Sequence, residues 1–288
     1  MTGLYSHDLQ ALIDRALAED LAAGDPTTDA LIPSSQTGRG MVIAKAEGVL
    51  AGAEAAAAVF RRVDPSLAVR VCLPDGSRLK HGVAVLEVSD RLASILTAER
   101  TALNLLQRLS GIATLTRRYV DAVAGTHARI ADTRKTTPGL RALEKHAVRM
   151  GGGTNHRRSL GDGVLIKDNH IAACHARGMS IADIIKAARQ HTPHTLKVEI
   201  EVTSLDQFRQ ALDAGADIIM LDNMPVDTMR QAVTIANGKA VLEASGGVNL
   251  QTLRAIAETD VDLISIGSLT HSAPSIDLSL EVAQDPAR

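Results

Sequence analysis

The sequence predicts an α/β protein in which an incomplete barrel of six to seven parallel strands follows an α+β domain. Between residues 128 and 268, six short apolar runs end in polar or glycine residues, and helical apolar spacing follows them. Glu201, Asp222 and Glu243 follow one another at intervals of 21 residues, the length of one strand, one loop and one helix. This repeat is typical of a TIM-like α/β barrel, although a doubly wound open sheet uses the same alternation. The six runs are 128–134, 163–169, 197–202, 217–223, 240–247 and 262–268.

The segment before the barrel combines helical and strand patterns. Apolar residues at helical spacing predict a helix over 9–17, which ends before the turn-forming sequence at 24–26. Runs rich in β-branched residues at 38–52 and 68–88 predict short strands. The alanine-rich segment 53–62 between them predicts a second helix. Together these elements predict an N-terminal α+β sandwich domain.

A long helix over 97–123 connects the two parts of the sequence. We expect an interruption at Ser110-Gly111, because glycine weakens a helix interior, and we place the domain boundary near it. The predicted domains are 1–112 for the α+β domain, 113–274 for the α/β barrel and 275–288 for a C-terminal tail.

Amphipathic helices are expected after the barrel strands. Apolar residues recur there at i, i+3 and i+7, so that each helix would present one apolar face to the sheet. These helices are expected near 140–150, 181–188, 205–212, 226–233 and 250–256.

The composition excludes several classes of protein. A formal net charge of -2 and a pI near 6.6 give no broad basic field for a nucleic-acid backbone, so we expect small-molecule partners. Two cysteines, Cys72 and Cys174, argue against a disulfide framework, and the Cys and His spacing gives no zinc motif. Residues 1–10 lack a signal-peptide pattern, and no stretch approaches the roughly 20 apolar residues of a membrane helix. We therefore expect a cytoplasmic protein without a membrane partner.

Strand parity places charged residues inside the predicted barrel. In the run 197–202, Lys197, Glu199 and Glu201 share one face, and the apolar residues between them share the other. The apolar face would meet the helices, so the charged face would point inward, where a charge requires a partner. The available cations are Arg134, Lys167 and Lys197 and the anions are Glu199, Glu201, Asp222 and Glu243, all expected near the carboxyl ends of strands.

The carboxyl ends of barrel strands usually carry the active site. A single charged residue there is most often a structural ion pair or a solvated loop residue. Charged residues on five strands favour a pocket for a substrate that carries both cation-binding and anion-binding groups, although a self-compensating polar plug is the alternative.

Glycine turns follow the last two predicted strands. Ser245-Gly246-Gly247 follows the fifth strand and Gly267-Ser268 the sixth, each just before a predicted helix. Glycine lets backbone N–H groups approach a phosphate, and the start of a helix favours negative charge. An ordinary loop is the alternative for each turn alone, but two adjacent turns favour a phosphate site, which His271 could also contact.

A second cluster is cationic. It contains Arg134 and Lys135, then His156, Arg157 and Arg158, and then Lys167. Guanidinium groups bind carboxylates in a bidentate manner, so the cluster suits a dicarboxylate or a pyrophosphate. A solvated loop is the alternative for Arg157 and Arg158. The three glycines at 151–153 instead favour a mobile or closely approached loop, which is common for segments that cover an active site.

Long strings in the sequence resemble the quinolinate phosphoribosyltransferase family. The strings are TAERTALNLLQRLSGIAT (97–114), DTRKTTPGLRALEKHAVRMGGGTNHR (132–157) and LIKDNHI (165–171), and the later segments EVTSLDQ, MLDNM, EASGGV and IGSLTHS extend the resemblance over nearly the whole chain. The resemblance implies conversion of quinolinate and 5-phosphoribosyl 1-pyrophosphate into nicotinate mononucleotide, pyrophosphate and CO2, with Mg2+, in NAD biosynthesis.

The resemblance also implies roles for individual residues. The cationic residues would hold the quinolinate carboxylates and the pyrophosphate, and the glycine turns would hold the 5-phosphate. Lys135, Lys167, Glu201 and Asp222 would be catalytic, and Glu201 and Asp222 would also bind Mg2+ through water. Arg100 would enter the active site of a neighbouring subunit in a homodimer or a higher oligomer. The implied substrate-binding residues are Arg100, Thr133, Arg134, Lys135, His156, Arg157, Lys167, Glu201, Asp222, Ser245, Gly246, Gly247, Gly267, Ser268, Leu269 and His271.

This chemistry depends on electrostatics more than on a nucleophile. Departure of pyrophosphate leaves positive charge on the ribose, which Glu201 and Asp222 can stabilise. Attack by the pyridine nitrogen then makes a cationic ring that can accept the electrons of the departing carboxylate. We therefore expect decarboxylation after ribosyl transfer.

Three alternatives remain at the level of sequence. A Schiff-base aldolase or lyase could use Lys167 as its amine. A non-catalytic protein could bind a phosphorylated metabolite through the same glycine turns. A related phosphoribosyltransferase-like protein linked to molybdenum transport shares the implied fold, but the set of arginines from Arg100 to Arg157 favours quinolinate.

Overall fold

The computed structural model describes residues 6–284, which divide into two compact units. Within the described range, unit 1 contains 6–117, 136–152 and 270–284, and unit 2 contains 118–135 and 153–269. The predicted domain borders at 112 and 274 stay predictions. Two predictions fall partly outside the described residues. They concern residues 1–5 of the segment 1–10, where no signal peptide is expected, and residues 285–288 of the expected C-terminal tail.

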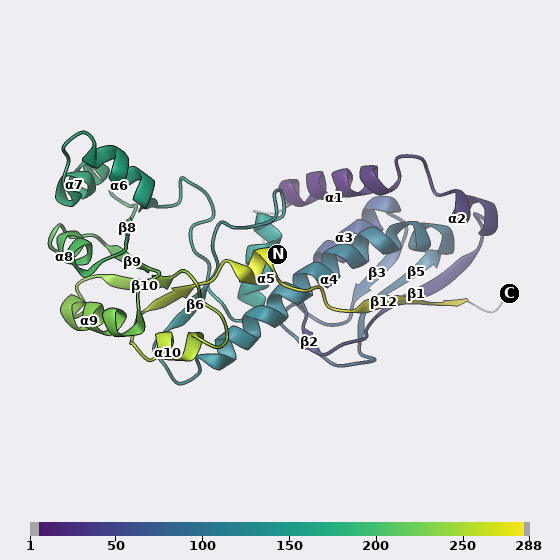
Figure 1. The fold of residues 1–288 in the computed structure, drawn as a ribbon. Coiled ribbons are helices and arrows are strands. Elements are labelled where there is room, and N and C mark those ends of the chain that lie inside the picture. Colours follow the sequence, from purple (N-terminus) through teal and green to yellow (C-terminus); the bar gives the residue numbers. More distant parts are fainter. Residues whose placement is uncertain (1–5, 285–288) are drawn as a thin grey trace. The chain divides into compact units, whose positions relative to one another are not determined.

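Unit 1 contains a four-stranded antiparallel sheet in the order β12-β1-β5-β3. The strand β12 pairs with β1 from Ala44↔Leu278 to Gly38↔Gln284, so the expected C-terminal tail contains a strand of this sheet (Figure 1). The elements of unit 1 up to α4 are α1 (Ser6–Asp20), α2 (Pro26–Leu31), β1 (Thr37–Ala44), β2 (Gly48–Val49), α3 (Ala53–Val63), β3 (Ala68–Val71), β4 (Arg78–Leu79) and β5 (Ala84–Arg91), and β12 is Leu278–Gln284.

The helix α4 (Leu92–Ala122) is continuous, so the predicted interruption at Ser110-Gly111 is wrong. Gly111 serves a close approach instead, because a Cβ at this position would collide with the carbonyl oxygen of Pro274. The glycine that suggested a break is therefore a packing residue.

The helix α5 (Arg141–Met150) was expected on the barrel but belongs to unit 1. Arg108 of α4 donates to Glu144 of α5, with Nη2 3.0 Å from Oε1, and the Glu144 side chain is fully buried. The Nε2 atom of His146 in α5 lies 2.7 Å from Oδ2 of Asp75. Breaking a buried ion pair is costly, so these contacts fix α5 in unit 1.

Unit 2 contains the six predicted parallel strands in the order β6-β11-β10-β9-β8-β7. From β7 onward each new strand lies beside the previous one, and the last strand, β11, pairs with the first, β6. In a doubly wound sheet the order of the strands would instead reverse at a switch point, so the observed order confirms the incomplete barrel. Among the described residues, the barrel is open between β6 and β7. The strands are β6 (Arg129–Ala131), β7 (Val164–Ile166), β8 (Val198–Val202), β9 (Ile218–Asp222), β10 (Val241–Ser245) and β11 (Leu263–Ser265).

Helices lie along the outer side of the barrel strands (Figure 1). Two of them begin after capping serines, because the hydroxyls of Ser180 and Ser204 accept from the backbone N–H groups of Asp183 and Gln207. The helices of unit 2 are α6 (Asp168–His175), α7 (Ile181–His191), α8 (Leu205–Asp213), α9 (Val226–Ala236), α10 (Leu253–Ala257) and α11 (Ser268–His271, whose last two residues fall in unit 1). Across residues 6–284, every helix is too short or too polar to cross a membrane.

Candidate active site

A cavity of about 610 Å³ lies at the carboxyl ends of the barrel strands, and all of its lining residues belong to unit 2. The structure therefore brings Arg134, Lys167, Glu201 and Asp222 to one pocket. The expected site residues that line it are Thr133, Arg134, Lys135, His156, Arg157, Lys167, Glu201, Asp222, Ser245, Gly246 and Gly247.

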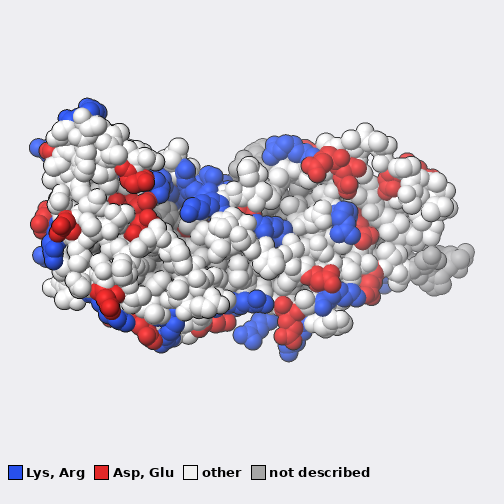
Figure 2. All heavy atoms as spheres, viewed as in Figure 1, with Lys and Arg blue, Asp and Glu red and all other residues white. Residues whose placement is uncertain are grey.

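The acidic side of the pocket is built by strand register. Glu201 pairs with Met220 and Asp222 pairs with Ser245, so the two carboxylates come from neighbouring strands near their ends. Lys167, which follows β7, donates to Glu201 with Nζ 2.6 Å from Oε2. Figure 2 shows acidic side chains next to basic ones on the face of unit 2 that is in view. The pocket thus offers adjacent groups of opposite charge.

The basic side of the pocket holds two guanidinium groups close together. Burial lowers the pKa of Arg157, and the positive charge of Arg134 lowers it further, against the effects of Glu199 and Asp162. Arg157 also donates from Nη1 to the carbonyl oxygen of Gly163 at 3.0 Å. Two neighbouring guanidinium groups repel one another, and an anion between them would relieve this repulsion.

The loop that carries His156 and Arg157 is fixed to the open edge of β6. Thr154 forms a parallel bridge with Ala131. The buried carboxylate of Asp132 accepts from the Asn155 side chain at 2.6 Å and from the backbone N–H of His156 at 2.9 Å. The closely approached loop that the three glycines predicted is therefore held by Asp132.

The glycine turn after β10 requires its glycines. Gly246 and Gly247 have φ values of 88° and 63°, in the left-handed region. A Cβ on Gly246 would collide with the side chain of Asn223, which donates to Asp222 at 2.9 Å. The turn therefore presents its backbone to the pocket beside an acidic residue of the neighbouring strand.

Five of the expected substrate-binding residues are not among the residues that line this pocket. Arg100 is exposed on α4 in unit 1, and His271 is exposed with Nδ1 2.6 Å from the Ser272 hydroxyl. The Leu269 side chain is fully buried, so only its backbone could meet a phosphate. Gly267 and Ser268 are half-buried at the start of α11.

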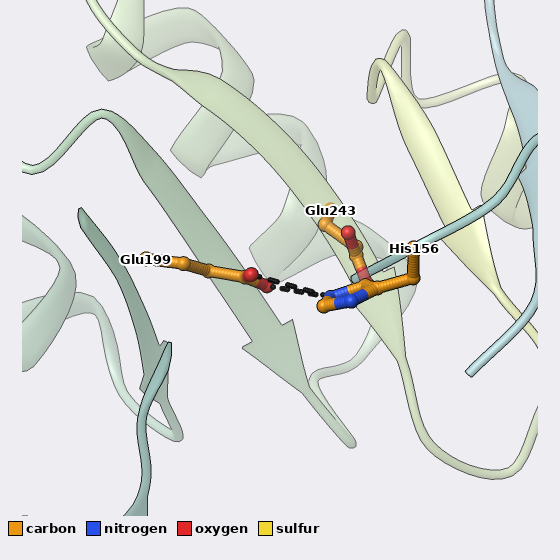
Figure 3. A group of neighbouring side chains, drawn as sticks. All are labelled: His156, Glu199 and Glu243. Carbon is orange, nitrogen blue, oxygen red and sulfur yellow. Dashed lines mark hydrogen bonds and ion pairs between the residues drawn. The ribbon is translucent and has the colours of Figure 1, made fainter. Parts of the chain in front are cut away.

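Three of the charges expected at the carboxyl ends of the strands lie elsewhere. Lys197 precedes β8 and is exposed at the amino end of the barrel. Glu199 and Glu243 lie deeper in the barrel, with 5% and 1% of their surfaces exposed. In Figure 3 both glutamates point toward the imidazole of His156. The parity prediction for Glu199 was correct, but its position along the strand was wrong because each strand spans several layers of the barrel.

The pocket also contains residues that were not predicted to bind substrate. Asn223 could have been suspected from its place beside Asp222 at a strand end. Leu165, Met220 and Ser265 carry no chemical signal in the sequence. In the sequence analysis, Glu243 was named only as one of several anions expected near strand ends. These five residues line the pocket through register and packing.

The donor set suits a hard divalent cation at one place in the pocket. Glu201 and Asp222 offer carboxylate oxygens on adjacent strand ends, and Mg2+ prefers one or two carboxylates together with water and phosphate oxygens. The residues present therefore fit Mg2+, with Glu201 and Asp222 as the groups that would hold it.

Comparisons with known proteins identify both parts of the chain. Residues 25–110 match the model of the quinolinate phosphoribosyl transferase N-terminal domain, and residues 112–281 match that of the C-terminal domain. The chain is 45% identical over 276 residues to the carboxylating nicotinate-nucleotide pyrophosphorylase of Mycobacterium leprae, which covers 94% of this chain and 95% of that protein. It is 39% identical over 293 residues to the decarboxylating quinolinate phosphoribosyltransferase 2b of Nicotiana tabacum, covering 96% and 83% of the two chains. The crystal structure of NadC from Streptococcus pyogenes matches with a TM-score of 0.94 at 40% identity, covering 99% of this chain and 100% of that one.

Proposed function

Because this chain belongs to the quinolinate phosphoribosyl transferase family, we propose that its charged pocket is the place where quinolinate and 5-phosphoribosyl 1-pyrophosphate react. The chain is an enzyme that transfers the phosphoribosyl group to quinolinate with decarboxylation. The products are nicotinate mononucleotide, pyrophosphate and CO2, and the reaction is a step of NAD biosynthesis. The observation that carries the placement is that guanidinium, ammonium and carboxylate groups line one cavity of unit 2.

The cationic wall suits the anionic parts of both substrates. Arg134, Lys135, His156 and Arg157 would hold the quinolinate carboxylates and the pyrophosphate, because guanidinium groups pair with such oxygens in a bidentate manner. The turn Ser245-Gly246-Gly247 would bind the 5-phosphate through its backbone N–H groups.

The acidic wall suits the ribose. Glu201 and Asp222 would stabilise the positive charge that develops on the ribose as pyrophosphate leaves. The same two carboxylates would hold Mg2+, which when bound neutralises charge on the pyrophosphate. Lys167, paired with Glu201, keeps this carboxylate oriented toward the pocket.

Decarboxylation follows ribosyl transfer in this proposal. Once the ring nitrogen carries the ribose, the ring is cationic and can accept the electron pair of the breaking carbon–carbon bond. Before that step the neutral ring offers no comparable stabilisation.

The Schiff-base alternative receives no support from the pocket. A Schiff base requires a neutral amine, whereas Lys167 Nζ lies 2.6 Å from the Glu201 carboxylate in an ion pair. Family membership also argues against a non-catalytic binding protein.

One assay tests the function. The purified protein is incubated with quinolinate, 5-phosphoribosyl 1-pyrophosphate and Mg2+, and nicotinate mononucleotide is measured by chromatography. A parallel incubation with nicotinate tests selectivity, and one with a chelator tests the metal. Product that forms equally fast from nicotinate, or without quinolinate decarboxylation, would contradict the proposal.

We infer that the active form is at least a homodimer in which Arg100 serves the pocket of the partner subunit. Support comes from the resemblance of the α4 sequence to the family and from the exposure of Arg100 on that helix. The cytoplasm stays the predicted compartment, supported by Cys72 and Cys174, which are both free.

Mixing two inactive variants tests the shared site. Arg100→Ala and Lys135→Ala proteins are expected to be inactive alone. After subunit exchange, half of the dimers would be mixed and each would contain one intact site, so about a quarter of wild-type activity should return. Activity measured after mild dissociation and reassociation checks this.

The control for the mixing experiment is reassociation of each variant with itself, which should restore nothing. If the mixture stays as inactive as its parents although mass spectrometry shows mixed dimers, Arg100 acts within its own chain or not at all.

A further inference from the structure

Decarboxylation of quinolinate creates a need for a proton inside the pocket. This inference rests on the proposed function. When the bond to the C2 carboxylate breaks, its electron pair stays on C2, and CO2 leaves without a proton. The product has a hydrogen at C2, so one proton must reach this carbon in each turnover. A positioned acid accelerates such a step by about 10²–10⁴-fold.

Glu243 lies at the floor of the pocket in an environment suited to an acid. It occupies the middle of β10 with 1% of its surface exposed, yet it lines the pocket together with Leu165 and Met220. Among the described residues, its Oε1 atom has no hydrogen-bond partner. Burial of an ionised carboxylate with one oxygen outside any hydrogen bond is costly, and protonation removes this cost, although a hydrogen bond with Ser265 favours the ionised form.

The neighbours of Glu243 are charged. His156 Nε2 lies 3.2 Å from Glu199 Oε2 and 3.7 Å from Glu243 Oε1, so two carboxylates flank one imidazole (Figure 3). Asp132 adds a further negative charge nearby, and Arg157 faces Glu199. Two carboxylates this close together do not both remain ionised at low cost.

The hydrogen bonds of His156 decide which glutamate is protonated. The backbone N–H of Arg157 donates to His156 Nδ1 at 2.7 Å, so Nδ1 is an acceptor and Nε2 carries the ring proton. This Nε2–H lies closer to Glu199 and stabilises its ionised form. If one of the two glutamates takes up a proton, that glutamate is therefore Glu243, while Glu199 stays ionised.

The titration of Glu243 agrees with this geometry. Burial raises the pKa of Glu243 to about 7, and the Glu199 carboxylate contributes to the rise while His156 opposes it. Glu243 therefore keeps its proton to a higher pH than an ordinary glutamate, which brings it closer to the range in which a general acid is most effective.

We propose that Glu243 is the general acid that protonates C2 of the ring after CO2 has left. The electron pair on C2 takes the carboxyl proton of Glu243, and the ring gains one C–H bond as the Glu243 carboxylate forms. One proton from water then restores the acid, so each turnover consumes one proton from the solvent.

A second cavity provides a route for this proton. It has a volume of about 490 Å³, lies at the amino ends of the strands and is lined by Glu199 and Glu243 together with Thr195 and Lys197. Glu243 lines both cavities, so in this proposal its proton is restored from the side opposite to the product.

Replacement of Glu243 by glutamine tests the proposal in two ways. In the wild type, kcat should fall as the pH rises through about 7, because the protonated acid is lost. Glu243→Gln should lower kcat about 10²-fold, abolish this dependence on pH and leave KM for 5-phosphoribosyl 1-pyrophosphate unchanged. Glu243→Asp, a shorter acid, should keep the pH dependence at a reduced rate.

Hydrogen exchange gives a readout that does not depend on turnover. The wild type with nicotinate mononucleotide in D₂O should exchange the C2 hydrogen, followed by NMR, because the proton transfer is reversible. Glu243→Gln should exchange at least about tenfold more slowly. Asp64→Asn is the matched control, since Asp64 is a buried carboxylate of unit 1 outside the pocket, and it should exchange like the wild type.

The outcomes separate the two proposals. If the wild type makes no nicotinate mononucleotide from quinolinate, the proposed function fails. If it does, but Glu243→Gln retains the wild-type kcat and pH profile, Glu243 is not the acid. Mn2+ bound at His156, Glu199 and Glu243, detected by paramagnetic resonance and lost in Glu243→Gln, would also overturn the proposal in favour of a metal site.

Discussion

Replacing Arg134 with alanine is expected to abolish turnover, with a loss in kcat/KM for quinolinate of about 10³-fold, and Lys135→Ala should behave similarly. Loss of one partner of a buried charge pair costs about 2–5 kcal/mol, and each 1.4 kcal/mol is a factor of about ten. Arg134 lies beside Arg157 on the wall of the cavity. Its removal therefore also lowers the positive charge of the cavity, and with it the affinity for the quinolinate dianion. Steady-state kinetics with varied quinolinate measures the effect.

The matched control for this change is Arg230→Ala. Arg230 is exposed on α9 and pairs with Asp227 at 2.8 Å, away from the pocket, so its removal should change kcat/KM by less than about twofold. The midpoint of urea unfolding should be the same in all three variants and the wild type. Turnover of Arg134→Ala at rates near the wild type would show that the cationic pocket lies elsewhere.

Glu201→Gln is expected to lower kcat by about 10²–10³-fold, because removal of one preorganised group that stabilises transition-state charge has an effect of this size. The amide keeps the shape of the side chain but loses the negative charge that we propose faces the ribose. Since the change acts on the transition state, KM for 5-phosphoribosyl 1-pyrophosphate should change far less than kcat. Initial rates at saturating substrates measure the loss.

Asp206→Asn serves as the control for Glu201→Gln. Asp206 lies in the first turn of α8 and its side chain is 89% exposed, so neutralising it tests the effect of one lost charge outside the pocket. It should leave kcat within about twofold of the wild type. If Glu201→Gln matched this control, Glu201 would be a structural partner of Lys167 rather than a catalytic group.

The barrel could be predicted from the sequence because its signal is local and repeated. Each of the six apolar runs became a strand, and the intervals between Glu201, Asp222 and Glu243 matched strand–loop–helix units. Three features depend on distant contacts and could not be predicted. Gly111 packs against Pro274, α5 is fixed by Arg108, and β12 joins β1 across most of the chain.

The site was predicted as a set of residue types rather than as an arrangement. The charged strand ends and the Gly246-Gly247 turn could be found because their chemistry is visible in the sequence. The depth of Glu199 and Glu243 could not, because strand parity fixes the face of a residue but not its layer in the barrel. The role of Asp132 in holding the His156 loop depends on a bridge between segments that are not adjacent in sequence.

The pairing of β12 with β1 affects the order in which the protein can fold during synthesis. The ribosome makes β1, then all six barrel strands, and only afterwards the residues that complete the first sheet. Throughout this interval the nascent chain carries β1 with one unpaired edge, to which extended segments of other chains can bind. Messages truncated just before codon 278 should therefore give a polypeptide that binds chaperones and aggregates, although it contains every residue that lines the pocket.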